Sequence, residues 1–462
     1  MIHNELDYFF SNIYRFLNID KEVKGLLVKK HSNNLQPLGD FSFPNTVKCW
    51  NEFLNSEVLQ NNSETLLQCL KKDIETLLQE SKGWVLPIKK ITEIKDRVHI
   101  FLERPQAIKI SLLQSFVINE YILHRVNENI SLVESEAVNS SCITSLRLSY
   151  MVKVIRNLYA LDKKCADIKP KVYVTTRSTC KCENSRVILC GAVLNAKTGL
   201  KENAITADEL IRIRQDEMTL IAQHRYGVRV STELKWKEFI AHLGESAVAF
   251  ELLQIRPSSS IKVQFDASSG SSKGAAFILY NCARLETIIR KFNDNVNEGI
   301  YPPLPKFDDI QVSLLSHEDE WCLIFNYILG LPTLLKSCVE LSDAKCEFRP
   351  HLICTYLSSM VKVFSQYYRK VRILTEPRKH LLPLIFARIY MLKSLNDTLK
   401  TCLSLLNIKS VSQMYFYFLL LSLFECMTHL YGLEEGVQRR RNPRAAGESP
   451  ARSASEVKLV LL

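Results

Sequence analysis

The stretch His351-Leu-Ile-Cys-Thr-Tyr-Leu-Ser-Ser-Met-Val-Lys-Val-Phe-Ser-Gln-Tyr-Tyr-Arg-Lys370 decides the fold of the C-terminal half. Apolar residues recur along it at steps of four or three, at Leu352, Tyr356, Met360, Phe364 and Tyr367. Such a spacing places them on one face of an α-helix. Residues 385–406 repeat the pattern, and residues 277–292 and 320–329 also have helical character. The sequence therefore predicts an all-α bundle from about residue 234 onward.

Residues 106–233 have a different pattern, in which helices alternate with short strands. Lys171–Thr175 and Arg186–Cys190 are rich in β-branched residues and are predicted to be buried strands. Leu146–Leu158 and Ala207–Arg225 are predicted helices, the second with Thr206 as its N-cap. Alternation of this kind favours a parallel sheet covered by helices.

Residues 1–105 mix short helical stretches with polar loops and end in a predicted half-buried strand, Arg97–Glu103. Residues 415–462 are an apolar block followed by a segment rich in Arg, Pro, Ala, Ser and Gly, which predicts disorder. We thus expect an α+β protein that is mostly α. Its predicted divisions are an N-terminal α+β region (1–105), an α/β region (106–233), a helical bundle (234–414) and a tail (415–462).

The composition is that of a globular protein, with 47% apolar and 24% charged residues in a chain of 462. A formal net charge of +11 is compatible with a phosphate-rich partner but does not identify one. The N-terminus has no secretory signal, and most of the 14 cysteines stand singly in apolar helical stretches. We interpret them as reduced core residues and expect a cytoplasmic protein, with the nucleus as the alternative.

Cys180 and Cys182, with Cys165 and Cys190 nearby, raise the alternative of a zinc site. Structural zinc sites usually space their cysteines as CxxC rather than CxC, so we expect buried or loop thiols and no metal. The longest near-continuous apolar run, Tyr415–Phe424, covers about ten residues and is too short to cross a membrane as a helix. We therefore expect no transmembrane segment and no membrane partner.

Three stretches resemble the DALR anticodon-binding domain of arginyl-tRNA synthetases, in the order of that family. Ser269–Arg284 has a Gly-rich turn that feeds a helix with the family's Tyr-x-x-Ala-Arg pattern, from Tyr280 to Arg284. Residues 351–374 resemble the domain's central helix and its exit, and Leu403–Met414 resembles its C-terminal end. The resemblance covers residues 240–414 and implies that the predicted bundle binds tRNA.

Upstream, residues 145–156 resemble the helix that follows the HxGH signature of these synthetases. In that register Cys142-Ile-Thr-Ser145 replaces the signature, and both histidines and the glycine are missing. The histidines stabilise charge on the ATP phosphates, and the glycine leaves room for the nucleotide. The second signature, a Lys-Met-Ser-Lys-Ser-type loop, is replaced by residues 195–203. The degenerate signature residues are Cys142, Thr144, Ser145, Lys197 and Lys201.

Residues 299–303, 320–326 and 371–378 resemble most closely a synthetase-derived family of DALR anticodon-binding domain-containing proteins, which lacks aminoacylation motifs. This resemblance implies a non-catalytic adaptor that binds arginine tRNAs and works with the methyltransferase that makes 3-methylcytidine in the anticodon loop. It implies no enzyme activity and no cofactor. Two other hypotheses stay open, namely a divergent arginyl-tRNA synthetase and a protein-interaction scaffold that does not bind RNA.

The candidate RNA contacts lie in the predicted bundle. Six positive charges fall within the 18 residues from Lys362 to Lys379, against one acid, Glu376. Such an edge suits the phosphates of an anticodon loop, although cations are also common at a solvated helix end. The residues that we expect to contact RNA are Tyr280, Asn281, Arg284, Lys362, Tyr367, Tyr368, Arg369, Lys370, Arg372, Arg378 and Met414.

Several of these residues have structural alternatives. Tyr367 and Tyr368 point about 100° apart on a helix, so one should pack inward while the other could stack on an unpaired base. Core packing of both is the alternative. Arg284 lies one turn from Tyr280, and a salt bridge within the bundle competes with a phosphate contact. The run 270–274 lacks Walker spacing and predicts a helix-entry turn, and the basic run 439–441 is interpreted as a solvated charge run.

Overall fold

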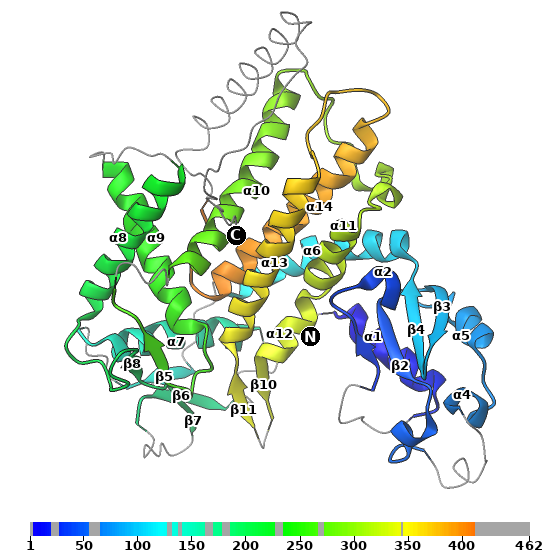
Figure 1. The fold of residues 1–462 in the computed structure, drawn as a ribbon, viewed down its shortest axis with the longest axis horizontal. Coiled ribbons are helices and arrows are strands. Elements are labelled where there is room, and N and C mark those ends of the chain that lie inside the picture. Colours follow the sequence, from blue (N-terminus) through cyan, green and yellow to red (C-terminus); the bar gives the residue numbers. More distant parts are fainter. Residues whose placement is uncertain are drawn as a thin grey trace, which may run out of the picture. The chain divides into compact units, whose positions relative to one another are not determined.

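The computed structural model describes residues 3–19, 27–54, 65–126, 132–136, 141–161, 170–177, 185–226, 234–266, 272–342 and 345–411 (Figure 1). The predictions for the tail from residue 415, for Met414 and for Cys165, Cys180 and Cys182 lie outside these ranges. The architecture is α+β and mostly α, as the sequence predicts.

The N-terminal region is built on a four-stranded antiparallel sheet in the order β1-β2-β4-β3. Its strands are β1 (Lys29–Lys30), β2 (Phe41–Pro44), β3 (Ile88–Ile94) and β4 (Arg97–Leu102). The predicted strand at 97–103 is therefore confirmed, and four of its six residues are buried. The helices of this region are α1 (Glu5–Phe16), α2 (Leu35–Leu38), α4 (Leu66–Cys69) and α5 (Ile74–Ser81), with a 3-10 turn at Val47–Trp50.

The apolar face of this sheet packs against α1. All four residues of β2 are buried, and Phe41 and Phe43 alternate with Ser42, so that one face of the strand is apolar and the other is polar. The ring of Phe9 on α1 stacks on that of Phe41, with centroids 4.3 Å apart. Hydrophobic burial therefore fixes which face of the sheet points away from the core, and that face carries polar residues.

The middle region contains the predicted parallel sheet, in the order β5-β6-β7. Its elements are β5 (Val133–Ser135), α7 (Ile143–Ala160), β6 (Lys171–Thr175), β7 (Ser185–Leu189), β8 (Val193–Asn195), α8 (Ala207–Tyr226), α9 (Leu234–Leu253) and β9 (Ile261–Val263). The expectation that residues 186–190 form a buried strand was wrong in part, because β7 lies at the edge of the sheet and Arg186 and Val187 are exposed. The second pair of strands, β8 and β9, is also parallel. Thr206 caps α8 as predicted: its Oγ accepts the N–H of Glu209, whose carboxylate accepts the N–H of Thr206.

A buried ionic cluster joins α8 to α9 and to the start of the bundle. The guanidinium of Arg214, which is fully buried, donates to Glu251 at 2.8 and 3.0 Å and to Glu217 at 3.0 Å. Glu217 in turn accepts the N–H of Ser272, the residue before the first bundle helix. Burial raises the pKa of the Glu251 carboxyl, and the hydrogen bonds from Arg214 oppose that rise. These paired charges connect α8 and α9 of the α/β region to the residue that precedes α10.

The bundle follows the predicted helical periods. It comprises α10 (Lys273–Asn297), α11 (Glu318–Leu323), a π-helical turn (Ile324–Ile328), α12 (Leu331–Cys338), α13 (Pro350–Lys370) and α14 (Leu382–Leu405), with 3-10 turns at Phe307–Asp309 and Val312–Leu314. Figure 1 shows α10, α13 and α14 lying alongside one another. The expectation of an all-α bundle from residue 234 was wrong in two places. Strand β9 lies between α9 and α10, and β10 (Val339–Leu341) and β11 (Cys346–Phe348) form an antiparallel hairpin between α12 and α13.

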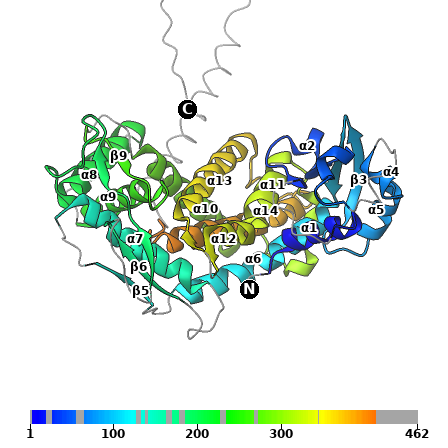
Figure 2. The same cartoon turned by 90° about the horizontal axis from the view of Figure 1, so that it is seen from below.

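The connecting helix α6 (Arg104–Val126) runs from the N-terminal sheet along α14 to the α/β region, as Figure 2 shows. The stretch Glu318–Cys338, which includes the π turn, is long and apolar enough to cross a membrane, with a mean hydropathy of 1.3. Its most apolar window is 67% buried within the fold, which is typical of a core helix in a soluble protein.

The N-terminal sheet is latched to the bundle by polar contacts in a buried setting. The indole N–H of Trp321 donates to Asp40 Oδ1 at 2.7 Å, and Lys30 Nζ donates to Asn326 Oδ1 at 2.5 Å. The Lys30 ammonium also lies 4.0 Å from the centre of the Phe325 ring. Burial raises the pKa of the Asp40 carboxyl to about 6 and lowers the pKa of Lys30 to about 8. Burial therefore disfavours the charged form of both side chains near neutral pH.

The raised pKa of Asp40 makes stability depend on pH in a specific direction. The folded state binds a proton at Asp40 more tightly than the unfolded state, so its contribution is greatest in acid and is lost as pH rises to about 6. We expect Asp40→Asn to abolish this pH dependence, which lowers the free energy of unfolding by about 2 kcal/mol between pH 4.5 and 7. Urea unfolding of both proteins between pH 4.5 and 7 measures it, and a constant difference between them over that range would refute the assignment.

Candidate RNA interface

The outer face of α13 presents a row of polar side chains. Lys362, Gln366 and Arg369 are exposed, and their spacing of four and three residues places them on one side of the helix. Gln366 was missed by the sequence analysis, although the same spacing would have found it. Beyond the helix end, Arg372 and Lys379 are exposed as well. Among the described residues, no carboxylate forms an ion pair with Lys362, Arg369, Arg372 or Lys379.

Two of the predicted cations already have acidic partners. Lys370 Nζ lies 2.8 Å from Asp319, and Arg378 pairs with Glu376 at 2.7 Å. Both cations are more than half exposed, so these pairs are weak and exchange readily with solvent or with a phosphate. We refer to Lys362, Arg369, Lys370, Arg372 and Arg378 as the cationic rim.

The structure removes two predicted contacts from the surface. Tyr367 is fully buried, and its hydroxyl donates to Glu320 at 2.9 Å. Asn281 is also fully buried, and its amide donates to the carbonyl of Phe277. The same Glu320 accepts a hydrogen bond from Arg388. An RNA base cannot reach either side chain in this conformation, so their predicted role as direct contacts does not fit the structure.

Tyr368, Arg284 and Tyr280 form a stack across the seam between α10 and α13. The guanidinium of Arg284 lies 4.4 Å from the centre of the Tyr280 ring and 4.5 Å from that of Tyr368. Arg284 also donates to the Tyr280 hydroxyl at 2.5 Å and to Asn281 Oδ1 at 3.2 Å. The predicted alternative, a salt bridge of Arg284, is replaced by cation–π contacts. All three side chains are half-buried, so their edges lie at the surface.

The degenerate signature lies at the start of α7, where Cys142 is the N-cap. Thr144 is buried, and its hydroxyl accepts the N–H of Val193 on β8 at 3.1 Å. Burial opposes ionisation of Cys142, but the N–H groups of Ser145 and Thr144, together with Lys201, hold the pKa of the thiol below its usual value. The start of α7 is thus hydrogen-bonded directly to the neighbouring strand.

Arg147, one turn further along α7, is fully buried and bonded only to backbone carbonyls. Its guanidinium donates to the carbonyls of Leu252, Gly191, Ser259 and Arg256 at 3.1, 2.6, 2.7 and 3.2 Å. Gly191 lets the two segments meet, because a Cβ there would lie 2.4 Å from the backbone of Ser259. An apolar cluster fills the space beside α7, with Ile143, Val193, Val248 and Ile261 among its buried members.

The segment at the position of the second signature is a tight turn after β8. Lys197 Nζ lies 3.0 Å from Asp266, and both side chains are exposed. The carboxamide of Asn195 accepts the N–H of Lys197, and Gly199 has a φ of +71° that closes the turn. Lys201 is exposed and pairs with Leu194 through a β-bridge. Lys197 is therefore paired with Asp266, whereas Lys201 lies close enough to the start of α7 to act on the Cys142 thiol.

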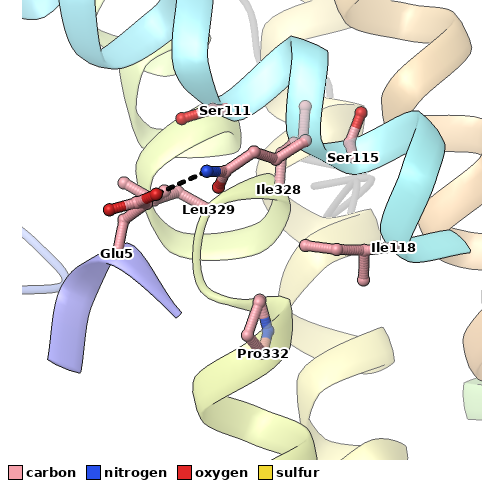
Figure 3. A pocket seen from close by; sticks show the side chains of 8 residues that line it. Glu5, Ser111, Ser115, Ile118, Ile328, Leu329 and Pro332 are labelled. Carbon is pink, nitrogen blue, oxygen red and sulfur yellow. Dashed lines mark hydrogen bonds between the residues drawn. The ribbon is translucent and has the colours of Figure 1, made fainter. Parts of the chain in front are cut away.

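Two small hollows that open to solvent enclose about 210 and 170 Å³ of space, and neither is lined by a residue of the degenerate signature. Figure 3 shows the first, between α1, α6 and α12, where Gln114 donates to Glu5. Both volumes are below the ~300–1,000 Å³ that is usual for small-molecule sites. In the described ranges no group of three or more His, Cys, Asp and Glu side chains is arranged to hold a metal ion. Cys190, one of the cysteines considered for a zinc site, is buried, and burial raises the pKa of its thiol to about 11.

Comparison with known proteins identifies the bundle. Residues 278–414 match the family model described as the DALR anticodon binding domain. The chain is 30% identical over 238 residues to a protein of Danio rerio named DALR anticodon-binding domain-containing protein 3. That match covers 50% of this chain and 42% of the relative. An arginine–tRNA ligase of Geobacter metallireducens is 27% identical over 188 residues, which covers 40% of this chain and 31% of that enzyme.

Solved structures extend the likeness to the rest of the fold. The arginyl-tRNA synthetase of Plasmodium falciparum superposes with a TM-score of 0.57, covering 90% of this chain and all of that one, at 12% sequence identity. An identity this low shows a shared fold and nothing about activity. The matches to the first of the curated relatives span less than half of their length. The chain thus combines an arginyl-tRNA synthetase-like fold with a DALR helical domain.

Proposed function

We propose, from the DALR helical domain and its cationic rim, that this chain is a non-catalytic tRNA-binding adaptor. It recognises arginine tRNAs through the bundle and supports 3-methylcytidine modification of their anticodon loop by a partner methyltransferase. The exposed cations of α13 and its exit carry the proposal, because Lys362, Arg369 and Arg372 have no acidic partner among the described residues. The half-buried stack of Arg284 includes Tyr368 of the same helix. The arginine specificity and the methyltransferase partner rest on family resemblance. The proposed location is the cytoplasm.

The packing at the start of α7 supports the non-catalytic part of the proposal. An ATP site needs donors that face an open cleft, where they can stabilise developing charge. Here the hydroxyl of Thr144 is bonded to β8, and the guanidinium of Arg147 donates to four backbone carbonyls. Apolar side chains fill the neighbouring space. The adaptor hypothesis is therefore favoured over a divergent synthetase.

Three assays on the purified full chain test the proposed function together. We expect a retarded complex with the anticodon stem-loop of an arginine tRNA, and a weaker one with a stem-loop of another specificity. We expect no arginine- and tRNA-dependent ATP–pyrophosphate exchange, because the signature histidines are replaced and the Thr144 hydroxyl is bonded to β8. Adding the chain to a 3-methylcytidine methyltransferase should raise methylation of arginine tRNA specifically.

Each assay fails in a different way. Exchange activity would make the chain a divergent synthetase. Absence of any shift at moderate salt would favour the protein-interaction scaffold. Binding without stimulated methylation would keep the RNA interface but remove the methyltransferase partner from the proposal. A known arginyl-tRNA synthetase serves as the positive control for exchange.

A further inference from the structure

The polar face of the N-terminal sheet carries a cross-strand row outside the bundle. Lys29 on β1 pairs with Ser42 on β2, and Ser42 pairs with His99 on β4. Side chains at such facing positions lie on the same face, within about 5 Å of their neighbours. Ser42 and His99 are buried, whereas Lys29 is exposed. The row therefore runs from a buried centre to an open edge.

His31 and Arg97 converge on the centre of this row. His31 Nε2 lies 2.9 Å from Ser42 Oγ, and Arg97 reaches the same hydroxyl with Nε at 3.2 Å and Nη2 at 3.0 Å. The guanidinium can only donate, so the hydroxyl hydrogen of Ser42 is left for His31 Nε2. His31 Nε2 is then the acceptor, and the imidazole proton lies on Nδ1. That N–H has no partner among the described residues, and it is a donor at the open side of the row.

The cluster is basic throughout. The rings of His31 and His99 stack with centroids 6.0 Å apart, and His99 Nδ1 is bonded to the carbonyl of Leu38. Burial lowers the pKa of His31, and the charged groups that face it, His99, Lys29 and Arg97, lower that pKa further. In the part of the chain that the structure describes, none of the four forms an ion pair.

Two carboxylates lie beside the row but are bonded elsewhere. The carbonyl of Asp40 accepts the N–H of His31, while its carboxylate accepts from the Trp321 indole and the N–H of Leu102. Glu93 pairs with Val98, whose side chain lies in the core, and Glu93 accepts a hydrogen bond from Asn45 at 2.6 Å. The row thus gathers two permanent cations, two imidazoles and an unused N–H without a described counter-charge. Like charges held this close destabilise one another unless an anion lies between them.

We propose that Lys29, His31 and Arg97 form an oxyanion site for a phosphate group on the polar face of the N-terminal sheet. Phosphate offers several strong acceptor oxygens, which match the ammonium of Lys29 and the imidazole N–H of His31 from β1 and its end, and the guanidinium of Arg97 from β4. His99 forms the buried wall of this site. The phosphate belongs either to a small free molecule or to a nucleic-acid backbone. The site is independent of the anticodon-binding proposal, because it lies on a different part of the chain.

Histidine NMR on the full chain tests the site directly. The ten histidines are labelled at ¹³Cε1, and inorganic phosphate is titrated at constant ionic strength. We expect saturable shifts at His31 and His99, which are assigned with His31→Gln and His99→Gln, and a higher pKa for His31 when phosphate is bound. The signals of His317 and His351 on the bundle should stay in place. Equal, non-saturating shifts of all histidines would overturn the proposal.

Matched lysine variants separate the site from general charge. Lys29→Gln should weaken phosphate binding about tenfold, because it removes one charge-assisted hydrogen bond. Lys82→Gln, an equally exposed position after α5, should leave binding unchanged. Equal affinity in the two variants would refute the role of Lys29 and the site with it. Shifts of the same two histidines with micromolar arginine tRNA would assign the phosphate to RNA, and shifts with inorganic phosphate alone would assign it to a small molecule.

Discussion

Reversing the charge of Arg369 and Arg372 to glutamate should weaken arginine tRNA binding by roughly 25-fold or more at 0.1 M salt. Each lost phosphate contact to single-stranded RNA lowers the salt slope by about 0.7, which corresponds to roughly fivefold in affinity at that salt. The two side chains are exposed and have no described acidic partner, so the loss is not offset by a released carboxylate. Filter binding between 50 and 300 mM salt measures both the affinity and the slope.

Controls separate a local effect from a change in net charge. Reversal of Lys82 and Lys153, which are exposed on α5's exit and on α7, changes the net charge by the same amount away from the bundle. It should cost at most a few-fold through the long-range field. Arg369→Lys with Arg372→Lys should retain most of the affinity, because phosphate contacts need charge more than shape. Unchanged binding in the double glutamate variant would exclude the cationic rim as the RNA interface.

Arg147→Met should destabilise the α/β region by about 3–5 kcal/mol, the largest stability effect that we expect from one substitution. Methionine fills much of the volume but leaves four buried carbonyls without their donor. These carbonyls belong to the end of α9, to the loop before β9 and to the segment before β8. Hydrogen exchange of the α7 and β8 amides measures the local opening, and urea unfolding measures the global loss.

Arg156→Met on the same helix is the matched control. Arg156 is exposed and donates to a single carbonyl, that of Val133, at 3.1 and 3.2 Å. Water replaces such a bond when it is lost, so the expected cost is about 1 kcal/mol or less. Equal effects of the two substitutions would show that the four hydrogen bonds from Arg147 to backbone carbonyls stabilise the region no more than the single contact of Arg156 does. The tRNA affinity of Arg147→Met at low temperature should be unchanged, because Arg147 lies on α7 and the cationic rim lies on α13 and its exit.

Local periodicity predicted the long helices because burial of one face is written directly in the spacing of apolar residues. The period of Leu357, Met360 and Phe364 is visible in any window of the chain, and all three are buried. The β10–β11 hairpin was missed because two strands of three residues are too short to show an alternation. Its strands follow α12 without a strong breaker, and pairing between residues 339 and 348 is what defines it. The sheet of the N-terminal region depends on pairing over a longer range still.

The candidate interface was predicted in part for the same reason. Runs of lysine and arginine with little nearby acid are read from the sequence, and all five residues of the cationic rim are exposed. The step of 100° between Tyr367 and Tyr368 predicts that they differ, but it does not say which one faces the core. Contact between Tyr368 and Arg284 joins two helices more than eighty residues apart, and no local pattern encodes it.

The guanidinium of Arg284 occupies one face of the Tyr280 ring and one face of the Tyr368 ring. A nucleobase that is to stack on the same face of either ring must therefore first displace Arg284, at about 0.5–2 kcal/mol for each contact broken. Only the conformation without the Arg284 contact can accept the base on that face, and its low population reduces the apparent affinity for RNA in proportion. We therefore expect base stacking at the seam between α10 and α13 only from an RNA loop whose other contacts compensate for the loss of the Arg284 contacts.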